Sequence, residues 1–460
     1  MKIKKLDDFK NKKIAILWYW LEGKSTLSFL IKLWITDITI LDKKDIKDIN
    51  KDFKYITWDN YLDNLDDFDL IIKAPWISPY QNHLEKFNEK ITTQTEIFTS
   101  LYNWKIIWIT GTKWKSTTST ILYLTLKNSW LNVKLVGNIW TPVLDEIDII
   151  NWEQFDFIIY EMSSYMLEWF EPKLFIWFIN NIYNCHLDWH DWILNYSNSK
   201  INILKNAKFK VANIEIKNQV KTIDEIDFFW EGSNFVYNQK SFYINWEKIL
   251  TDDWFLIQWD HNRLNMIWII TILYQIKKFR NWSPWLFNKH INFLKETLCH
   301  FKWLPHRLEE IWTYKGILFI DDSIATTPES TIAAIKTYEH KIWTLFLWWY
   351  DYGFEFDELV KNIKKYEIKN LVLFPESGEK ILWDLSNFNY DNDFKLNHNW
   401  YEFNILKTKS MEQAIIFAYK NTSSWKICLL SNASASYGLW SWYIEKWNQF
   451  QEFAKKHSIN

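Results

Sequence analysis

Short apolar runs alternate with stretches of helical periodicity along most of the chain. Near the N-terminus, residues 13–17 form an apolar run, residues 23–33 place apolar side chains at helical spacing, and residues 38–41 form a second run that ends at Asp42. This order predicts a strand, a helix and a second strand, which is how a parallel sheet begins. A further short strand is expected at residues 69–73.

The same alternation continues through the rest of the chain. Further buried strands are expected at residues 105–110, 155–161, 175–182, 317–321, 344–347, 371–374 and 427–430. Helices are expected at residues 115–127 and 192–207 and from about Asp260. Strands that alternate with helices predict an α/β fold with mainly parallel sheets. We expect three domains, with boundaries near residues 95 and 300.

Charge and cysteine content exclude several classes of protein. The formal net charge is −2, which gives no general attraction to nucleic acid or to an anionic membrane. No apolar run reaches the roughly 18 residues of a membrane span, and the N-terminal residues do not resemble a signal peptide. Cys185, Cys299 and Cys428 have no paired spacing, so neither a disulfide framework nor a zinc site is expected. We therefore predict a cytoplasmic protein.

Tryptophan and glycine contents are both abnormal. The chain has 33 Trp and 8 Gly, whereas average usage of Gly would give about 32 residues in this length. Several Trp stand where a turn needs a residue without a side chain, among them Trp18, Trp20, Trp114 and Trp140. We hypothesise that most of these Trp are glycine in the natural protein, encoded by UGA in a code that reads this codon as glycine. The alternative is a protein that is truly rich in Trp, and UGG codons at these positions would prove it.

The strongest candidate motif lies at residues 108–117, W-I-T-G-T-K-W-K-S-T. With glycine at Trp108 and Trp114 it becomes a phosphate-binding loop between a strand and a helix, whose backbone N–H groups face the phosphates. Lys115 would contact the β and γ phosphates of ATP, and Ser116 would bind Mg²⁺. The predicted ATP-binding residues here are Trp108, Gly111, Thr112, Lys113, Trp114, Lys115, Ser116 and Thr117. As printed, Trp114 would obstruct the loop, and a surface loop with a chance Lys-Ser pair is the alternative.

A second nucleotide motif occurs near the N-terminus. The segment W-Y-W-L-E-G follows the first strand, and Asp42 ends the second. This arrangement is typical of a nucleotide site, but alone it is weak. NAD, a nucleotide sugar such as a UDP-sugar, and a purely structural turn all remain open. The predicted substrate-binding residues in it are Trp18, Trp20, Leu21, Glu22 and Asp42.

Further candidate residues follow other strands. Glu161 ends a buried strand and could bind a metal ion or begin a helix, and His186 with Asp188 lies on the exit loop of the next strand. Near residue 300, Arg307 suits phosphate binding, because a guanidinium can clamp oxygen pairs. Asp322 and Ser323 end another strand, and the Ser-rich turn L-L-S-N-A-S-A-S could hold a carboxylate. Ordinary loop chemistry is an equal alternative for each of these.

In their order, these motifs resemble the Mur ligase superfamily, and within it the MurD type, the UDP-N-acetylmuramoyl-L-alanine:D-glutamate ligases. The resemblance covers nearly the whole chain. It is carried by G-N-I-W-T-P-V-L, E-M-S-S-Y-M-L-E, H-L-D-W-H, W-L-P-H-R-L-E and D-D-S-I-A-T-T-P-E-S-T, besides the two nucleotide motifs. Folylpolyglutamate synthases share the phosphate loop but lack the N-terminal nucleotide domain.

The resemblance implies a three-domain enzyme. Residues 1–95 would be a Rossmann-like domain that binds the UDP substrate, residues 96–300 a P-loop ATPase-like domain, and residues 301–460 a Rossmann-like domain that binds glutamate. ATP would phosphorylate the alanyl carboxylate of UDP-N-acetylmuramoyl-L-alanine, and the amine of glutamate would attack the acyl phosphate. The implied role is in peptidoglycan precursor synthesis, and thereby in cell wall biogenesis, cell shape and cell division. We expect a monomer without nucleic acid or membrane insertion.

Residue roles are implied by position. Glu161 and His186 would bind Mg²⁺, and Lys200 would be carbamylated to bind a second Mg²⁺. The catalytic residues would be Lys115, His186 and Lys200. Further ATP contacts would come from Asn262, Asn265, Arg307 and Asp322, and substrate contacts from Asn138, Ser163, Ser323, Ser436 and Tyr443.

Three positions depart from the family pattern. Cys185 stands where an acid is common, Ile324 where many members have Lys, and Tyr352 where a cation is frequent. The identity and stereochemistry of the added amino acid are therefore open, and an L-glutamate ligase or another Mur-type ligase is an alternative. A non-catalytic homologue would follow if the Trp residues are real. A dinucleotide oxidoreductase would leave the second and third domains unexplained.

Overall fold

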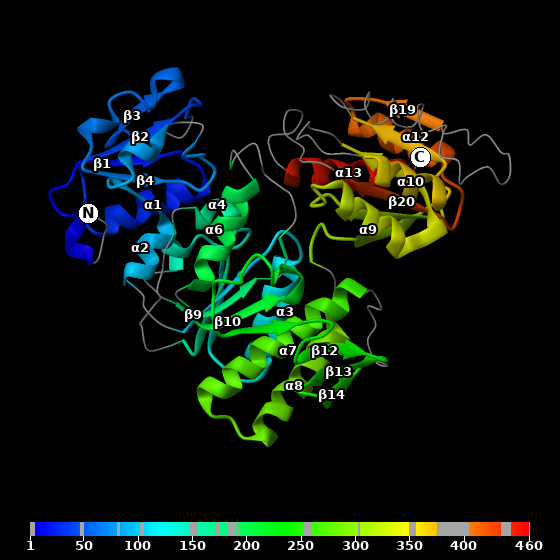
Figure 1. Cartoon of the computed structure of the whole chain (residues 1–460). Helices are drawn as coiled ribbons and strands as arrows, with labels where there is room; N and C mark the ends of the chain where they lie inside the picture. Colours follow the sequence, from blue (N-terminus) through cyan, green and yellow to red (C-terminus); the bar gives the residue numbers. More distant parts are fainter. Residues whose placement is uncertain are drawn as a thin grey trace. The chain divides into compact units, whose positions relative to one another are not determined.

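The protein forms two compact units, Met1–Phe301 and Lys302–Asn460, in the computed structural model (Figure 1). Each unit is described by itself. The structure describes residues 5–46, 50–80, 83–101, 105–146, 155–168, 170, 174–179, 181–182, 190, 193–205, 207–252, 260–301, 304–348, 356–374, 404–433 and 443–459.

The first sheet of unit 1 is five-stranded and wholly parallel. Its strands are β1 (Ile14–Leu17), β2 (Ile38–Asp42), β3 (Lys54–Thr57), β4 (Leu70–Lys73) and β5 (Ile91–Thr92), in the spatial order β3-β2-β1-β4-β5. Helix α1 (Leu21–Lys32) connects β1 to β2, and α2 (Gln94–Leu101) follows β5. All four side chains of β1 are buried, which explains its continuous apolar run. Because the strand order reverses beside β1, the loops after β1 and β4 meet at one edge of the sheet.

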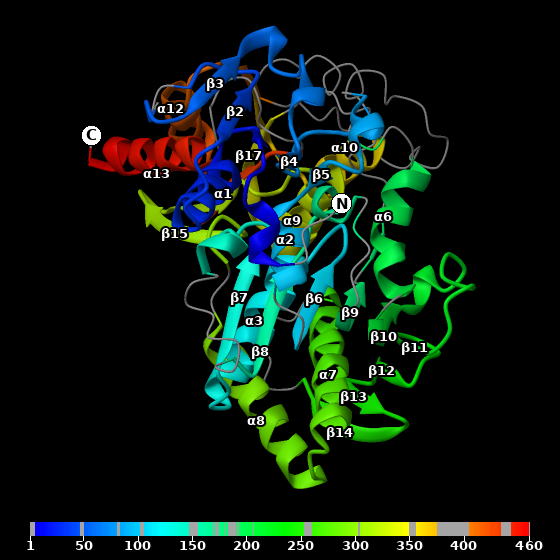
Figure 2. The ribbon, with the colours of Figure 1, turned by 90° about the vertical axis from the view of Figure 1, so that its left-hand side faces the viewer.

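The second sheet of unit 1 has nine strands, in the order β14-β13-β12-β11-β10-β9-β6-β8-β7 (Figure 2). They are β6 (Ile106–Thr110), β7 (Val133–Gly137), β8 (Phe157–Glu161), β9 (Leu174–Ile179), β10 (Ala207–Asn213), β11 (Ile226–Phe229), β12 (Phe235–Asn238), β13 (Ser241–Ile244) and β14 (Glu247–Thr251). Its helices are α3 (Lys115–Asn128), α4 (Ser164–Leu167), α6 (Ile193–Lys205), α7 (Asp260–Arg280) and α8 (Pro284–His300). The strands from β7 to β12 pair in parallel, and β12, β13 and β14 form antiparallel hairpins.

Unit 2 is a sheet between two layers of helices. Its strands are β15 (Glu309–Tyr314), β16 (Ile317–Asp322), β17 (Ile342–Leu347), β18 (Asn370–Leu373), β19 (Asn404–Lys407) and β20 (Ile427–Ser431), in the order β15-β16-β20-β17-β18-β19. Helices α9 (Pro328–Tyr338) and α10 (Asp357–Lys365) pack on one face, and α12 (Met411–Asn421) and α13 (Tyr443–Ile459) pack on the other. Only β15, at the edge, pairs antiparallel.

The predicted α/β class with mainly parallel sheets is confirmed. Every strand expected from an apolar run is present within a few residues. The strands that were not predicted are β3, β5, β7, β10, β11, β12, β13, β14, β15 and β19. Among the described residues, no helix is long and apolar enough to cross a membrane. The division of unit 1 near residue 95 remains a prediction.

Many Trp residues occupy backbone conformations that favour glycine. Of the described residues, eight Trp have positive φ: Trp18, Trp34, Trp58, Trp114, Trp130, Trp230, Trp246 and Trp425. Trp34 follows α1, and its N–H donates to Ile31 O while the N–H of Ile35 donates to Leu30 O. This is the Schellman pattern, in which glycine is the usual residue at positive φ. The indole of Trp34 is 90% exposed, so packing does not compensate for the strained backbone.

A hairpin turn gives independent support for the glycine hypothesis. Asn245 (φ 51°) and Trp246 (φ 70°) are the two residues between β13 and β14, and the Trp246 side chain is 81% exposed. Two-residue hairpin turns with positive φ at both positions strongly favour Asn-Gly. Glycine at position 246 would give that sequence. The structure thus supports the hypothesis at this position, and the codons remain the decisive test.

Candidate active site

The loop between β6 and α3 is held in place by the chain that follows β9. Gly111 has φ 153°, and Trp114, at φ 68°, precedes the first residue of α3. The N–H of Thr112 donates to Asn181 O over 2.9 Å, and the N–H of Lys113 donates to Asn181 Oδ1 over 2.8 Å. The strand–loop–helix arrangement places the N-terminus of α3 at the carboxyl edge of the sheet, as a phosphate-binding loop requires.

The side chain of Trp108 faces away from this loop. It is fully buried in the middle of β6 and stacks between Tyr160 and Trp177, with ring centroids 4.7 and 4.9 Å away. Its indole therefore belongs to the core and does not face a nucleotide. Lys115, by contrast, turns back over the loop, and its Nζ lies 3.2 Å from Thr112 O.

Glu161 is the centre of a buried polar cluster at the end of β8. Its Oε1 accepts hydrogen bonds from Ser116 Oγ (2.9 Å) and Asn138 Nδ2 (2.6 Å). Its Oε2 accepts from Ser119 Oγ (3.2 Å) and Trp140 Nε1 (2.8 Å). Three predicted site residues, Ser116, Asn138 and Glu161, are thus brought together from α3, the loop after β7, and β8.

This cluster fits a Mg²⁺ ion. Mg²⁺ prefers oxygen ligands at about 2.0–2.1 Å in octahedral geometry, so neighbouring ligands lie about 2.9 Å apart. Ser116 Oγ and Glu161 Oε1 are 2.9 Å apart. The indole N–H of Trp140 occupies the other carboxylate oxygen. Glycine at position 140 would leave that oxygen for a metal ion or for the water molecules around it.

Lys200 reaches the same loop from α6. Its side chain is 1% exposed, and its Nζ lies 3.2 Å from Thr110 Oγ1 and 3.3 Å from Gly111 O. Tyr196, one helical turn earlier, places its ring 5.1 Å from Lys200 Nζ and shares a hydrogen bond with Thr112 Oγ1 at 2.6 Å. Tyr196 was not predicted, although its spacing of four residues from Lys200 puts both on one helix face.

The N-terminal motif forms a tight turn around Asp42. Asp42 Oδ2 accepts from the N–H of Tyr19 and Oδ1 from the N–H of Lys44, both over 2.8 Å. A Cβ on Gly23 would stand 2.3 Å from Trp18 O, so α1 can approach β1 only with glycine there. Trp20 and Leu21, at the start of α1, are both half-exposed.

Glu22 and Lys73 are two titratable groups beneath this turn. Burial raises the pKa of Glu22 to about 7, and the charge of Lys73 opposes the shift. Burial lowers the pKa of Lys73 to about 8, against the attraction of Glu22, Glu168 and Glu96. Lys73 Nζ donates to Ala74 O (3.2 Å) and Ile77 O (2.9 Å), which shapes the loop after β4.

The remaining predicted residues of unit 1 are placed as follows. Thr117 is buried in α3, and Ser163 accepts a hydrogen bond from the N–H of Met166 as the N-cap of α4. Asn265 is buried on α7 and accepts from Thr118 Oγ1 at 3.4 Å. Asn262 also lies on α7, but its side chain is outside the described residues, as are His186 and Cys185.

In unit 2, Asp322 is buried at the end of β16. It accepts from Ser431 Oγ (2.8 Å) and from the N–H of Leu308 (3.3 Å). Burial raises the pKa of Asp322 to about 7, opposed first by the charge of Arg307. Ser323 O accepts from Asn432 Nδ2 (2.7 Å) and from Lys446 Nζ (3.3 Å).

Lys446, on α13, was not predicted as part of this site. Its side chain is 1% exposed, and burial lowers its pKa to about 7, while Asp321 and Asp322 act in the other direction. Of the other predicted positions, Ser436 and Tyr352 lie outside the described residues. Tyr443 begins α13 with its side chain undescribed, and Ile324 donates its N–H to His306 O.

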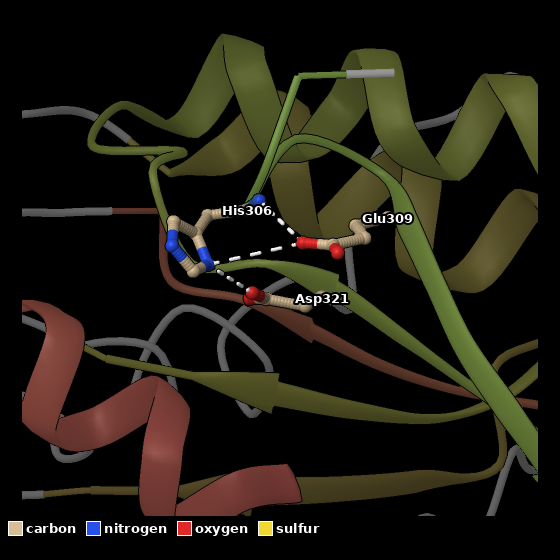
Figure 3. Close-up of side chains that lie close together, drawn as sticks. All are labelled: His306, Glu309 and Asp321. Atoms are coloured by element: carbon tan, nitrogen blue, oxygen red, sulfur yellow. Dashed lines mark hydrogen bonds and ion pairs between the residues drawn. The ribbon is translucent and has the colours of Figure 1, made fainter. Parts of the chain in front are cut away.

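A cluster of His306, Glu309 and Asp321 lies beside Arg307 (Figure 3). His306 Nδ1 is 2.8 Å from Asp321 Oδ2 and 3.9 Å from Glu309 Oε2, and the N–H of His306 donates to Glu309 Oε2 over 2.8 Å. Three such groups could hold a metal ion. The hydrogen bonds account for the cluster without one, since they tie the turn before β15 to β16 and hold His306 at φ 65°.

Comparison with known proteins gives a domain match and several full-length relatives. Residues 109–248 match the Mur ligase middle domain. The chain is 28% identical to the UDP-N-acetylmuramoylalanine--D-glutamate ligase of Clostridioides difficile and 26% identical to that of Acetivibrio thermocellus, in each case over 97% of this chain and 98% of the relative. The chain thus contains a Mur ligase middle domain and is similar over its whole length to Mur ligases. Its full-length relatives are of the MurD type, and it is an ATP-dependent ligase that forms carbon–nitrogen bonds.

Solved structures show the same fold. UDP-N-acetylmuramate-alanine ligase MurC from Thermotoga maritima aligns with a TM-score of 0.59 at 14% identity, over 97% of this chain and 100% of that one. MurF from Thermotoga maritima in complex with ADP aligns with a TM-score of 0.54 at 15% identity, over 99% and 98%. At these identities the likeness is one of fold, and it confirms the α/β architecture of Mur ligases for this chain.

Proposed function

We propose that this ligase adds D-glutamate to UDP-N-acetylmuramoyl-L-alanine in peptidoglycan precursor synthesis. The full-length match to two proteins named for that reaction supports the substrate pair. The observation that carries the proposal is the Glu161 cluster, because it joins Ser116 of the phosphate loop to Asn138 in one buried site. Ser116 would hold the metal ion beside ATP, and Asn138 is assigned to the sugar substrate. Both donate a hydrogen bond to Glu161 Oε1.

The proposed reaction has two steps. An oxygen of the alanyl carboxylate attacks the γ-phosphorus of ATP, and the bond from that phosphorus to ADP breaks. The amine nitrogen of glutamate then attacks the acyl carbon, phosphate leaves with the former carboxylate oxygen, and the nitrogen loses a proton. Positioning and charge neutralisation supply most of the acceleration in such phosphoryl transfers.

This chain's residues divide the work. Lys115 and the backbone N–H groups at the N-terminus of α3 bind the phosphates and neutralise their charge. Ser116 and Glu161 would hold Mg²⁺, which would withdraw charge from the phosphoryl oxygens. Lys200, once carbamylated, would present a carboxylate to a second Mg²⁺ from the other side of the loop. His186 is assigned, together with Glu161, as a Mg²⁺ ligand by its place in the motif.

Domain and residue assignments follow the same proposal. Residues 1–95 would bind the UDP part through the turn at Trp18–Glu22 and Asp42, and residues 96–300 would bind ATP, with Asn262 and Asn265 at the adenine. Residues 301–460 would bind glutamate through Ser323, Ser436 and Tyr443, and would contribute Arg307 and Asp322 to ATP binding. We propose a cytoplasmic monomer that supports cell wall biogenesis, cell shape and division.

Phosphate release with a panel of amino acids tests the proposal. The natural gene product, given UDP-N-acetylmuramoyl-L-alanine, ATP and Mg²⁺, should release phosphate with D-glutamate. L-glutamate, L-alanine, L-lysine and diaminopimelate should each give at least about 100-fold less, because a site built for one set of charged groups rejects the others. Release with another amino acid and not with D-glutamate would keep the ligase class and overturn the substrate.

A further inference from the structure

A chain of contacts connects the loop after β4 to the phosphate loop. The β4 loop (residues 74–80) ends at Tyr80, whose hydroxyl donates to Glu168 Oε1 over 2.5 Å. Glu168 Oε2 lies 2.8 Å from His190 Nδ1. The carboxylate of Glu168 therefore bonds to Tyr80, 88 residues before it in the chain, and to His190, 22 residues after it. None of these residues is Trp, although Trp76 of the same loop packs on Tyr165, whose ring stacks on His190.

From His190 the contacts continue to the phosphate loop. The ring of His190 packs edge-on against Tyr196, with centroids 5.3 Å apart, and His190 O accepts from Asn195 Nδ2 over 2.9 Å. Tyr196 shares its 2.6 Å hydrogen bond with Thr112, inside the phosphate loop. Helix α6 carries Tyr196 together with Lys200, so a shift of His190 would move both groups that touch residues 110–112.

Both ends of this chain of contacts are firmly held. Lys73 fixes the β4 loop through Ala74 O and Ile77 O, and its buried charge also attracts Glu168. At the other end, Asn181 holds the N–H groups of Thr112 and Lys113. His190 is fully buried, and His190 and Glu168 have side-chain exposures of 0% and 8% in their pair. A buried hydrogen-bonded carboxylate is strongly specified in position, since loss of one partner leaves a desolvated polar group.

One short segment, residues 161–168, contacts both the phosphate loop and the β4 loop. Glu161, Ser163 and Glu168 lie within eight residues that run from the end of β8 through α4. One carboxylate binds Ser116 of the phosphate loop, and the other binds Tyr80 of the β4 loop. The β4 loop stands at the switch point of the first sheet, where ligands bind in such folds. The same segment therefore contacts the phosphate loop of the second sheet and the β4 loop of the first sheet.

We propose that Tyr80, Glu168, His190, Tyr196 and Thr112 form a relay, and that Glu168 is a positioning residue that couples occupancy of the sugar-nucleotide site to the shape of the phosphate loop. The inference rests on the proposed function, because it takes the first sheet to bind the sugar nucleotide. Binding there shifts the β4 loop, and the relay passes that shift to Thr112 and Lys200. By linkage, ATP must then tighten binding of the sugar nucleotide by the same factor.

The first experiment measures that factor. The Kd of UDP-N-acetylmuramoyl-L-alanine is measured by calorimetry on the full chain, with and without saturating adenylyl imidodiphosphate and Mg²⁺. We expect the analogue to tighten binding at least about 5-fold in the natural protein. Tyr80→Phe and Glu168→Gln should reduce the factor below about 2, with the Kd in the absence of analogue changed less than about 3-fold. Tyr419→Phe in unit 2, which also loses a 2.5 Å hydroxyl bond, is the matched control and should keep the natural factor.

A second measurement needs neither substrate. Hydrogen exchange of a peptide that covers residues 106–118 should be faster in Tyr80→Phe and Glu168→Gln than in Tyr419→Phe, because the relay no longer holds Thr112. In kinetics, Tyr80→Phe and Tyr196→Phe should each lower kcat more than they change KM. The double variant should be no worse than the more affected single variant within about 2-fold.

The outcomes distinguish failure of the proposed relay from failure of the proposed function. Equal exchange in all variants, or a coupling factor that survives Glu168→Gln, overturns the relay whatever the substrate is. Altered exchange in a protein that ignores UDP-N-acetylmuramoyl-L-alanine keeps the mechanical link and overturns the proposed function instead. Additive losses in the double variant would mean that Tyr80 and Tyr196 act separately, and would also overturn the relay.

Discussion

Ser116 Oγ donates a 2.9 Å hydrogen bond to Glu161 Oε1, and both groups are buried. The hydroxyl belongs to the first turn of α3, which follows β6, and the carboxylate to the end of β8. Because β6 and β8 are neighbours in the nine-stranded sheet, the bond joins the helix after one strand to the end of the next. The pair fixes the place where a metal ion would meet the phosphates.

Ser116→Ala and Glu161→Gln should each lower kcat by at least about 100-fold. Both remove an oxygen ligand or its charge from the Mg²⁺ site, where electrostatic stabilisation is worth several kcal/mol. Phosphate release at several Mg²⁺ concentrations is the measurement, and the Mg²⁺ needed for half-maximal rate should rise. Ser129→Ala, which removes a hydroxyl that bonds only to the α3 carbonyl of Thr125, serves as control. A Glu161→Gln enzyme with unchanged Mg²⁺ response would contradict the metal role.

Lys200 should carry a carbamate in the active enzyme. Its Nζ stands at the loop, 3.3 Å from Gly111 O, where a carboxylate could face a second metal ion. Protein incubated with ¹³C-bicarbonate should show a carbamate resonance in NMR, and Lys200→Arg should lack it and lose at least about 100-fold in kcat. Lys205→Arg, on the same helix but exposed, should keep both the resonance and the rate. A resonance that persists in Lys200→Arg would place the carbamate elsewhere.

Glycine at position 246 should stabilise the chain. Trp246 has φ 70° in an exposed hairpin turn, a conformation that costs a side-chain-bearing residue about 1–2 kcal/mol. Trp246→Gly should therefore raise the free energy of unfolding of unit 1 by about 1 kcal/mol, measured by urea denaturation. Trp285→Gly is the matched comparison, because Trp285 is also largely exposed (71%) but lies in the first turn of α8, where glycine should destabilise the helix by up to about 1 kcal/mol.

Asp322 should make the stability of unit 2 depend on pH. Its pKa is raised from 3.8 to about 7 by burial, so the folded state binds the proton more tightly than the unfolded state does. The free energy of unfolding should then fall as pH rises from about 4 to about 7, by up to about 1.4 kcal/mol for each unit of pKa difference. Denaturation curves of the natural chain and of Asp322→Asn should diverge in that range. Parallel curves would show that the carboxyl ionises normally.

Much of the fold follows from sequence pattern because buried parallel strands have no polar face. The runs that became β1, β6, β16 and β20 are apolar up to their last one or two residues, and all their side chains but one are buried in the structure. The β13–β14 hairpin was missed for a physical reason. Its turn signal is Asn followed by a residue at positive φ, and Trp at position 246 hides it.

Some residues of the candidate site could likewise be predicted from the sequence, and others could not. Ser116 and Glu161 could be predicted because they sit in a loop motif and at a strand end. Lys200, on α6, was implied only by the family resemblance. Tyr80 and Glu168 could not, since their bond joins residues 88 positions apart that carry no local pattern. Lys446 is hidden for another reason: a lysine in an amphipathic helix is normally solvated, and only the packing of α13 shows that this one is buried.

The two units are joined by a single passage of the chain, between Phe301 and Lys302. An exchange of everything after that junction would leave both sheets of the first unit, with their loops and helices, covalently untouched. Ancestral genes could thus have recombined at this one point and replaced the second unit without rebuilding either sheet of the first. The same junction offers protein engineers a natural place to assemble chimeric ligases.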